Sequence, residues 1–349
     1  MIGKVDLHTH VLPEKLPDLE SRYGVHGFVQ LAHTSGGCAK LTIDGAHCRD
    51  IDSRSWDPKR RIEDCDRHGV QLQVLSTVPV LFSYWAPAEA GLDLARLLND
   101  HIAALVRDYP GRFAGLGTVP LQDPDRAILE LERCMGPLGL AGVEIGTHVN
   151  DWNLDDPRLF PWFSRCRELD AAIFVHPWEM MGRERMPRFM LPWLVGMPAE
   201  TSLAACSLVL GGVLDRLPGL KVCLAHGGGA FPWTLGRISH AWSARPDLCA
   251  VQAGADPRQY AKHFYYDSLL HDPEALRFLL RQVGVERVGI GSDYPFPLGE
   301  SIPGSLAESL AELTDSDRER LSFGTAREFL ARGDPQPALS SSGATRSRP

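Results

Sequence analysis

Short runs of apolar and β-branched residues alternate along the chain with longer segments whose apolar positions recur at helical spacing. Gly, Pro, Asn or Asp bound most of the short runs, which is typical of buried strands that end in turns. Eight runs have this character: Lys4–Leu7, Gln71–Ser76, Phe113–Val119, Gly142–Gly146, Ala172–Val175, Lys221–Ala225, Phe264–Asp267 and Arg287–Ile290. Eight strands that alternate with helices predict an α/β protein with a (β/α)₈ TIM barrel.

The segments between the strands carry helix signals. Helices are indicated by Asp57-Pro58 before Arg61–His68, by Asp123–Arg126 at the start of a segment that runs to Met135, and by Asp272-Pro273 before Glu274–Val283. An open doubly wound sheet shows the same alternation of strands and helices. Its phosphate-binding GxGxxG turn is absent after the first strand, so the barrel is favoured.

Two segments depart from the repeating strand-helix unit. Residues 11 to about 55 form a long connection in which Phe28–Gln30 and Lys40–Ile43 flank Gly-rich turns, so we predict a small β insertion over the strand ends. Residues 335–349 are rich in Ser, Pro and Gly, which predicts a disordered tail. The expected organisation is one metal-dependent barrel domain over residues 1–334, followed by that tail.

Composition narrows the class of protein. The chain has 349 residues, of which 44% are hydrophobic and 23% charged, as expected of a soluble globular protein. A net charge of −8 without a Lys/Arg cluster argues against nucleic-acid binding. The sequence contains no run of about 18 uncharged apolar residues, which argues against a membrane span and a signal peptide. We therefore predict a cytosolic protein. The eight cysteines form no CxxC pair, which predicts free thiols.

Ionisable side chains fall at the carboxyl ends of the predicted strands. His8 and His10 close the first strand, His176 the fifth, His226 the sixth and Asp293 the eighth. In a barrel these ends surround one mouth, where barrel active sites lie. Residues almost 290 positions apart in the chain can therefore meet in one site.

The spacing of these residues suits a metal. His8 and His10 are two positions apart on a strand, so both imidazoles point the same way while Thr9 faces the helix layer. His176 and Asp293 complete a set that suits Zn²⁺ and leaves a position open for water or substrate. The open position indicates catalysis.

Other candidates are less determined by the pattern. His226, which three glycines follow, could be a ligand or a base; the base is favoured because four ligands already fill a zinc shell. Arg49 and Arg237 could each bind a carboxylate, but from the pattern alone an ordinary surface arginine is favoured at both positions. Trp193 and Phe296 could line the pocket or pack in the core.

Several segments also resemble a known family. The strings HPWEM, LPWLVGMPAET, AHGGGAFPW and GSDYPFPLGE, together with Val5–His10, resemble the 2-amino-3-carboxymuconate-6-semialdehyde decarboxylase family, which belongs to the metal-dependent decarboxylases of the amidohydrolase superfamily. The similarity extends from about residue 3 to residue 333. Glu179 departs from the familiar HPWD string, and the tail has no counterpart.

The resemblance implies a role for each candidate. His8, His10, His176 and Asp293 would bind zinc, His226 would be the catalytic base, and Arg49 would bind a substrate carboxylate in a pocket lined by Trp193 and Phe296. Arg237 would enter the neighbouring subunit's site, which implies a homodimer. The implied reaction is the non-oxidative conversion of 2-amino-3-carboxymuconate 6-semialdehyde to 2-aminomuconate 6-semialdehyde in tryptophan catabolism through kynurenine, which limits quinolinate and NAD formation.

Two alternatives remain open. Another decarboxylase of the superfamily, or a mononuclear zinc hydrolase, would use the same ligands. A binuclear hydrolase is disfavoured, because the end of the fourth strand, Gly142–Thr147, lacks the Lys that would bridge two metal ions. A non-catalytic metal-binding protein is disfavoured because both His226 and Asp293 are present.

Overall fold

Eight parallel strands form one sheet in the computed structural model, which describes residues 3–331. In order across the sheet they are β1 (Lys4–Val11), β5 (Val70–Thr77), β6 (Phe113–Gly117), β7 (Gly142–Gly146), β10 (Ala172–His176), β11 (Lys221–Leu224), β12 (Tyr265–Asp267) and β13 (Val288–Gly289). Each strand coincides with one of the eight predicted runs. The main deviation is β1, which extends four residues past its predicted end, so that His8 and His10 lie within it.

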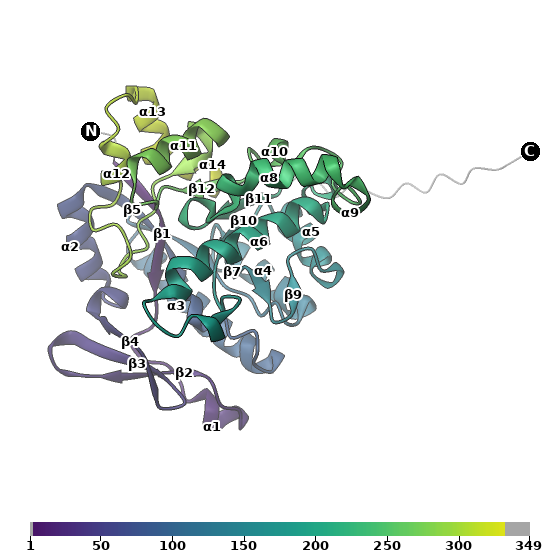
Figure 1. Cartoon of the computed structure of the whole chain (residues 1–349). Coiled ribbons are helices and arrows are strands. Elements are labelled where there is room, and N and C mark those ends of the chain that lie inside the picture. The colour runs from purple at the N-terminus through teal and green to yellow at the C-terminus, as the bar shows by residue number, and fades with distance from the viewer. Residues whose placement is uncertain (1–2, 332–349) are drawn as a thin grey trace, which may run out of the picture.

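The first strand and the segment after the last one lie side by side and nearly close the barrel. The Leu7 amide donates to the Ile290 carbonyl at 2.8 Å, and the Asp293 amide donates to the His8 carbonyl at the same distance. The His10 amide donates to the Tyr294 carbonyl, also at 2.8 Å. These bonds confirm the predicted (β/α)₈ fold and fix Asp293 beside the two β1 histidines (Figure 1).

Helices surround the barrel and bury its outer face. The longer ones are α2 (Pro58–His68), α3 (Ala88–Asp108), α4 (Pro124–Met135), α5 (Phe160–Glu168), α6 (Met197–Leu210), α8 (Phe231–Ala244) and α11 (Pro273–Val283). Shorter ones are α7 (Val213–Arg216), α9 (Pro246–Cys249), α10 (Pro257–Tyr260), α12 (Ser305–Glu308), α13 (Asp315–Glu319) and α14 (Thr325–Leu330). Asp57, Asp123 and Asp272 cap α2, α4 and α11 as predicted, each accepting a backbone N–H of the first turn.

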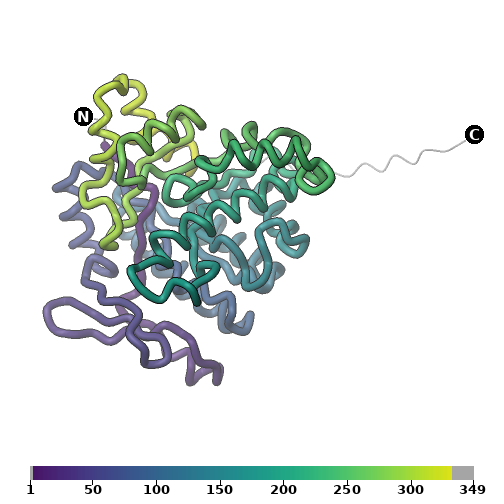
Figure 2. Tube along the Cα trace, in the orientation of Figure 1, coloured from purple at the N-terminus to yellow at the C-terminus, as the bar shows by residue number. Residues whose placement is uncertain are grey.

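The connection after β1 forms a separate small sheet. It contains α1 (Leu19–Tyr23) and the antiparallel strands β2 (Val29–His33), β3 (Cys38–Ile43) and β4 (Ala46–Asp52). Figures 1 and 2 show this segment extending from one end of the barrel, as predicted for the β insertion. A two-stranded ribbon, β8 (His148–Val149) with β9 (Trp152–Asn153), follows β7. The predicted tail lies outside the described residues, and the domain boundary stays a prediction.

Two further findings concern apolar and sulfur-containing side chains. All eight cysteines are free, as predicted.

Within the described residues, one helical segment, Pro192–Leu210, has the length and mean hydropathy (1.4) of a membrane span. Its most apolar window is 44% buried inside the fold, and because a core helix passes the same test, this is weak evidence for a membrane segment.

Candidate active site at the carboxyl end of the barrel

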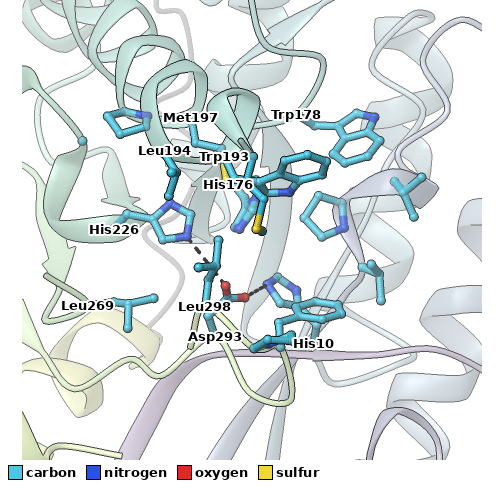
Figure 3. A pocket seen from close by; sticks show the side chains of 18 of the residues that line it. His10, His176, Trp178, Trp193, Leu194, Met197, His226, Leu269, Asp293 and Leu298 are labelled. Atoms are coloured by element: carbon cyan, nitrogen blue, oxygen red, sulfur yellow. Dashed lines mark ion pairs between the residues drawn. The ribbon is translucent and has the colours of Figure 1, made fainter. Parts of the chain in front are cut away.

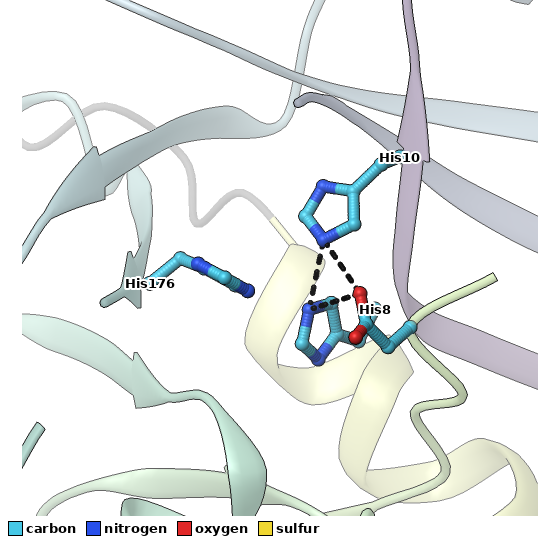
Figure 4. A group of neighbouring side chains, drawn as sticks. His8, His10 and His176 are labelled. Carbon is cyan, nitrogen blue, oxygen red and sulfur yellow. Dashed lines mark hydrogen bonds and ion pairs between the residues drawn. The ribbon is translucent and has the colours of Figure 1, made fainter. Parts of the chain in front are cut away.

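The four side chains predicted to bind metal meet at one end of the barrel. His8 and His10 come from β1, His176 is the last residue of β10, and Asp293 follows β13. One ligand atom from each lies within 4.8 Å of the others, and all four residues are buried. Figure 4 shows His176 approaching the β1 histidines from the opposite side. Thr9 points outward, where its hydroxyl accepts a hydrogen bond from Arg61 of α2 at 3.0 Å.

Hydrogen bonds hold the three imidazoles with Nε2 directed inward. Nδ1 of His8 faces Asp267 Oδ2 at 2.7 Å, Nδ1 of His10 faces the Thr77 carbonyl at 2.8 Å, and Nδ1 of His176 faces the Pro177 carbonyl at 3.0 Å. Because each Nδ1 faces an acceptor, we assign it the proton, which leaves Nε2 free to bind a cation. Acceptors opposite Nδ1 are the usual support of metal-bound histidines.

The inward atoms fit a divalent cation. Nε2 of His8 and Nε2 of His10 are 3.1 Å apart, and Asp293 Oδ1 lies 3.0 Å from Nε2 of His10. Nε2 of His176 is buried with no hydrogen-bond partner among the described residues, an arrangement that would be costly if nothing bound there. Three imidazole nitrogens and one carboxylate around one point are a donor set for Zn²⁺ or a similar ion.

Burial favours neutral imidazoles at two of the ligands, His10 and His176. Burial lowers the pKa of His10 and His176 below the ordinary value for histidine. Burial alone would also lower the pKa of His8, but the bond and charge of Asp267 raise it to about 9. A proton on His8 and a cation in the site would compete for the same Nε2 lone pair.

His226 lies beside the ligand group but outside it. It begins the turn after β11 with a left-handed backbone (φ 55°), and its Nε2 is 4.0 Å from Asp293 Oδ2. Figure 3 shows His226 and His10 on opposite sides of Asp293. Burial, reinforced by the charge of His8, lowers the pKa of His226 to about 4. Its imidazole is therefore neutral near pH 7 and can accept a proton.

A cavity of about 710 Å³ opens above these residues. Its walls include the polar residues His10, Cys48, Arg49, His176, His226, His271 and Asp293 and the apolar residues Leu41, Val78, Val80, Trp178, Met190, Trp193, Leu194, Met197, Trp233, Leu269, Leu270, Phe296 and Leu298. Arg49, from β4 of the insertion, lies with its guanidinium carbon 4.3 Å from the centre of the Phe296 ring. Burial lowers the pKa of Arg49, although an arginine stays charged even then.

Arg237, unlike the other predicted substrate-binding residues, does not line this cavity. It is exposed on α8, and no hydrogen bond or ion pair connects it to another described residue. A role for Arg237 in catalysis would therefore require a second copy of the chain. Trp193 and Phe296, in contrast, line the cavity of their own chain.

Four buried polar residues at this end of the barrel were not identified from the sequence. Asp6, Arg61, Glu144 and Asp267 are each at most 1% exposed. Asp6 accepts hydrogen bonds from the backbone and hydroxyl of Ser292, and the Glu144 carboxylate lies 3.7 Å from Nδ1 of His10. For Asp6, Glu144 and Asp267, the sequence did offer a signal, namely a charged residue in a short apolar strand. A buried charge needs a partner, but the sequence does not show which residue the folded barrel supplies.

Comparison with known proteins identifies the protein family to which the chain belongs. The family model for amidohydrolases matches residues 5–332, so the chain belongs to the amidohydrolase family. It is 56% identical to the 2-amino-3-carboxymuconate-6-semialdehyde decarboxylase of Dictyostelium discoideum over 94% of this chain and 91% of that protein. It is 38% identical to the protein of the same name from Caenorhabditis elegans over 94% of both chains. The resemblance noted in the sequence is confirmed.

A solved structure supports the fold independently. The dihydroxybenzoic acid decarboxylase of Polaromonas, with bound manganese and the inhibitor 2-nitroresorcinol, has a TM-score of 0.75 and covers 95% of this chain and 97% of its own. The two sequences are 23% identical, so this likeness concerns the fold alone.

Proposed function

We propose that this protein is a zinc-dependent, non-oxidative carboxy-lyase that converts 2-amino-3-carboxymuconate 6-semialdehyde to 2-aminomuconate 6-semialdehyde. The observation that carries the proposal is the group of four buried ligands with the neutral His226 just outside it, 4.0 Å from Asp293. The 56% identity to the Dictyostelium decarboxylase supports the choice of substrate. In a cell the reaction would belong to tryptophan catabolism through kynurenine and would limit quinolinate and NAD formation.

Zinc is proposed because three imidazoles and one carboxylate suit its coordination preferences. Manganese in the Polaromonas structure makes Mn²⁺ the competing choice. A divalent cation held by His8, His10, His176 and Asp293 would supply Lewis-acid chemistry and lower the pKa of a bound water.

The remaining chemistry is assigned to the chain's own side chains. His226 takes the proton from the attacking water, because its low pKa keeps the imidazole neutral. Asp293, whose Oδ2 faces His226, relays a proton to the carbon that loses CO₂. The hydroxide left by that proton transfer adds to the carbon next to the one that bears the scissile carboxylate. When this adduct collapses, the bond to the carboxylate breaks, CO₂ and the added hydroxide leave, and the hydroxide takes up a proton from solvent to regenerate water. The relayed proton stays on the carbon that lost CO₂. The step balances without O₂ or an organic cofactor.

Substrate binding is assigned to Arg49 and to the apolar lining of the cavity. Arg49 is the cation placed to bind a carboxylate, and its contact with the Phe296 ring holds the guanidinium at the wall of the cavity. An aromatic and aliphatic lining around Trp193 would exclude water from the reacting carbons.

A homodimer is part of the proposal. Arg237 has no hydrogen bond or ion pair with another described residue. Large apolar side chains are exposed on α8, where Trp233 is 52% exposed, and in the segment before α6, where Phe189 is 73%, Val195 55% and Leu194 54% exposed. Clusters of this kind usually mark protein contacts. We also propose a cytosolic location.

The decisive experiment mixes the purified zinc-loaded protein with freshly generated 2-amino-3-carboxymuconate 6-semialdehyde. We expect CO₂ release to match the loss of substrate absorbance mole for mole, with no activity after chelation. Loading with Mn²⁺ in parallel tests the identity of the cation. Substrate loss without CO₂ would instead support a hydrolase, and an unchanged substrate would contradict the proposed function.

A further inference from the structure

One buried carboxylate contacts both the ligand group and the candidate base. Asp267, at the end of β12, accepts through Oδ2 from Nδ1 of His8 at 2.7 Å and from the backbone N–H of His226 at 2.8 Å. Its Oδ1 accepts from the backbone N–H groups of Gly227 at 2.8 Å and Leu269 at 3.1 Å. The residue is 0% exposed, so all four donors depend on this one side chain.

The bonds to His226 and Gly227 support an unusual backbone. Both residues are left-handed, with φ values of 55° and 61°, a region that histidine rarely adopts. Successive N–H groups in such a turn can converge on an anion. Here the anion is the Asp267 carboxylate, and the turn it holds determines where the His226 imidazole enters the cavity.

We infer that Asp267 is a positioning residue that couples the ligand His8 to the base His226. Through Nδ1 it fixes the His8 ring with Nε2 toward the ligand group, and through two backbone bonds it fixes the direction of His226. The role at His226 rests on the proposed function, whereas the role at His8 concerns metal binding alone. Loss of Asp267 should therefore weaken both metal binding and turnover.

Asparagine is an informative replacement because it keeps the size of the side chain. Its amide presents one acceptor oxygen and one NH₂ group. In either orientation the NH₂ group faces two N–H donors, those of His8 and His226 or those of Gly227 and Leu269. Asp267→Asn thus removes the charge and opposes donor to donor without opening a cavity.

The test compares Asp267→Asn with Glu130→Gln, a matched control. Glu130 is also a buried carboxylate, 1% exposed, but it accepts from Asn99 and Arg133 in the helix layer. Zn²⁺ affinity is measured by competition with a chromophoric chelator, and kcat and KM are measured with the metal site saturated. In Asp267→Asn we expect Kd for Zn²⁺ to rise about 10–100-fold, and kcat to fall at least about tenfold while KM changes less than about threefold.

A folded Asp267→Asn protein with wild-type Zn²⁺ affinity, or with wild-type kcat once the metal site is saturated, would overturn the coupling. So would the same Kd increase in Glu130→Gln, since that would indicate a general loss of structure. If Asp267→Asn does not fold, Asp267→Ser is measured in the same way and the same outcomes decide. Absence of turnover in the wild type would refute the proposed function but leave the Zn²⁺ comparison, which needs no substrate, to decide whether Asp267 supports the ligand group.

Discussion

Arg61 donates a hydrogen bond of 2.7 Å from Nη1 to the backbone carbonyl of His10. The arginine lies in α2 and is fully buried, and Nη1 also donates to the Arg54 carbonyl while Nη2 donates to the Thr9 hydroxyl. The Tyr294 ring lies 4.8 Å from its guanidinium carbon. Arg61 therefore connects the helix layer to the backbone of the ligand His10 and to Tyr294, which follows the ligand Asp293.

Replacing Arg61 by Met should lower the free energy of unfolding by about 3 kcal/mol or more, because two buried acceptors and one partly buried acceptor lose their donor. Chemical denaturation of the metal-free protein measures this change. Arg60→Met is the control, because Arg60 is half-exposed and pairs with the exposed Glu63, a contact worth at most about 1 kcal/mol. Equal losses in the two variants would contradict the structural role of Arg61.

One divalent ion should bind per chain, since one group of four buried ligands lies at the barrel mouth. Elemental analysis after dialysis counts the ions. Exhaustive chelation should abolish decarboxylation and lower Tm, because a cation that binds only the folded chain stabilises it. Two tightly held ions per chain, or full activity after chelation, would exclude a mononuclear site.

His226→Ala should keep its metal and lose about 10²–10⁴-fold in kcat, as expected when a general base is removed. His176→Ala should lose the metal itself, because His176 supplies an Nε2 atom to the ligand group. Metal content and kcat are measured on both proteins. If His226→Ala lost metal as completely as His176→Ala, His226 would be a ligand.

Acid should destabilise the metal-free wild type more than metal-free His226→Ala. Burial lowers the pKa of His226 from 6.5 to about 4, so between these values the unfolded chain binds a proton that the folded chain excludes. Stability is therefore lost as pH falls through this window. Integrated over it, the difference should reach up to about 3 kcal/mol. Unfolding curves at several pH values measure it, and parallel behaviour of the two proteins would contradict the low pKa.

Arg237 is predicted to act in the neighbouring subunit. Arg237→Ala and His176→Ala should each be inactive, but a heterodimer of the two would contain one pocket with both metal and arginine. Mixing them under conditions of subunit exchange should restore up to about half the activity per heterodimer, by counting sites. No recovery despite verified heterodimers, or a fully active monomer, would refute the shared site.

The sequence was sufficient for the strands and for the residues at their ends. Apolar runs of four to seven residues bounded by turn residues identify a strand without knowledge of its neighbours, and a barrel then brings all strand ends together. For this reason His8, His10, His176 and Asp293 could be placed in one site before any distance was known. The insertion was predicted from its length and Gly-rich turns.

Residues that act through other residues were not predictable in the same way. Asp267 follows two tyrosines in an apolar run, and nothing local shows that it contacts His8, 259 positions away, or the turn at His226. Arg61 looks like one charge among several on an amphipathic helix. Their partners are set by barrel closure, which is a long-range property, and the destination of Arg237 depends on another chain altogether.

The insertion that carries Arg49 buries Phe28, Val29 and Leu41 in an apolar cluster that it shares with Leu81 after β5 and with residues of α3, whereas the candidate ligands and the base come from the ends of the barrel strands. Under the proposed function, recognition of a carboxylate and the chemistry that removes it would be encoded in separate stretches of sequence. Mutations in the sheet β2–β4 can reshape the binding wall while the barrel mouth stays intact. Evolution within such a scaffold can therefore change the preferred substrate and preserve the reaction.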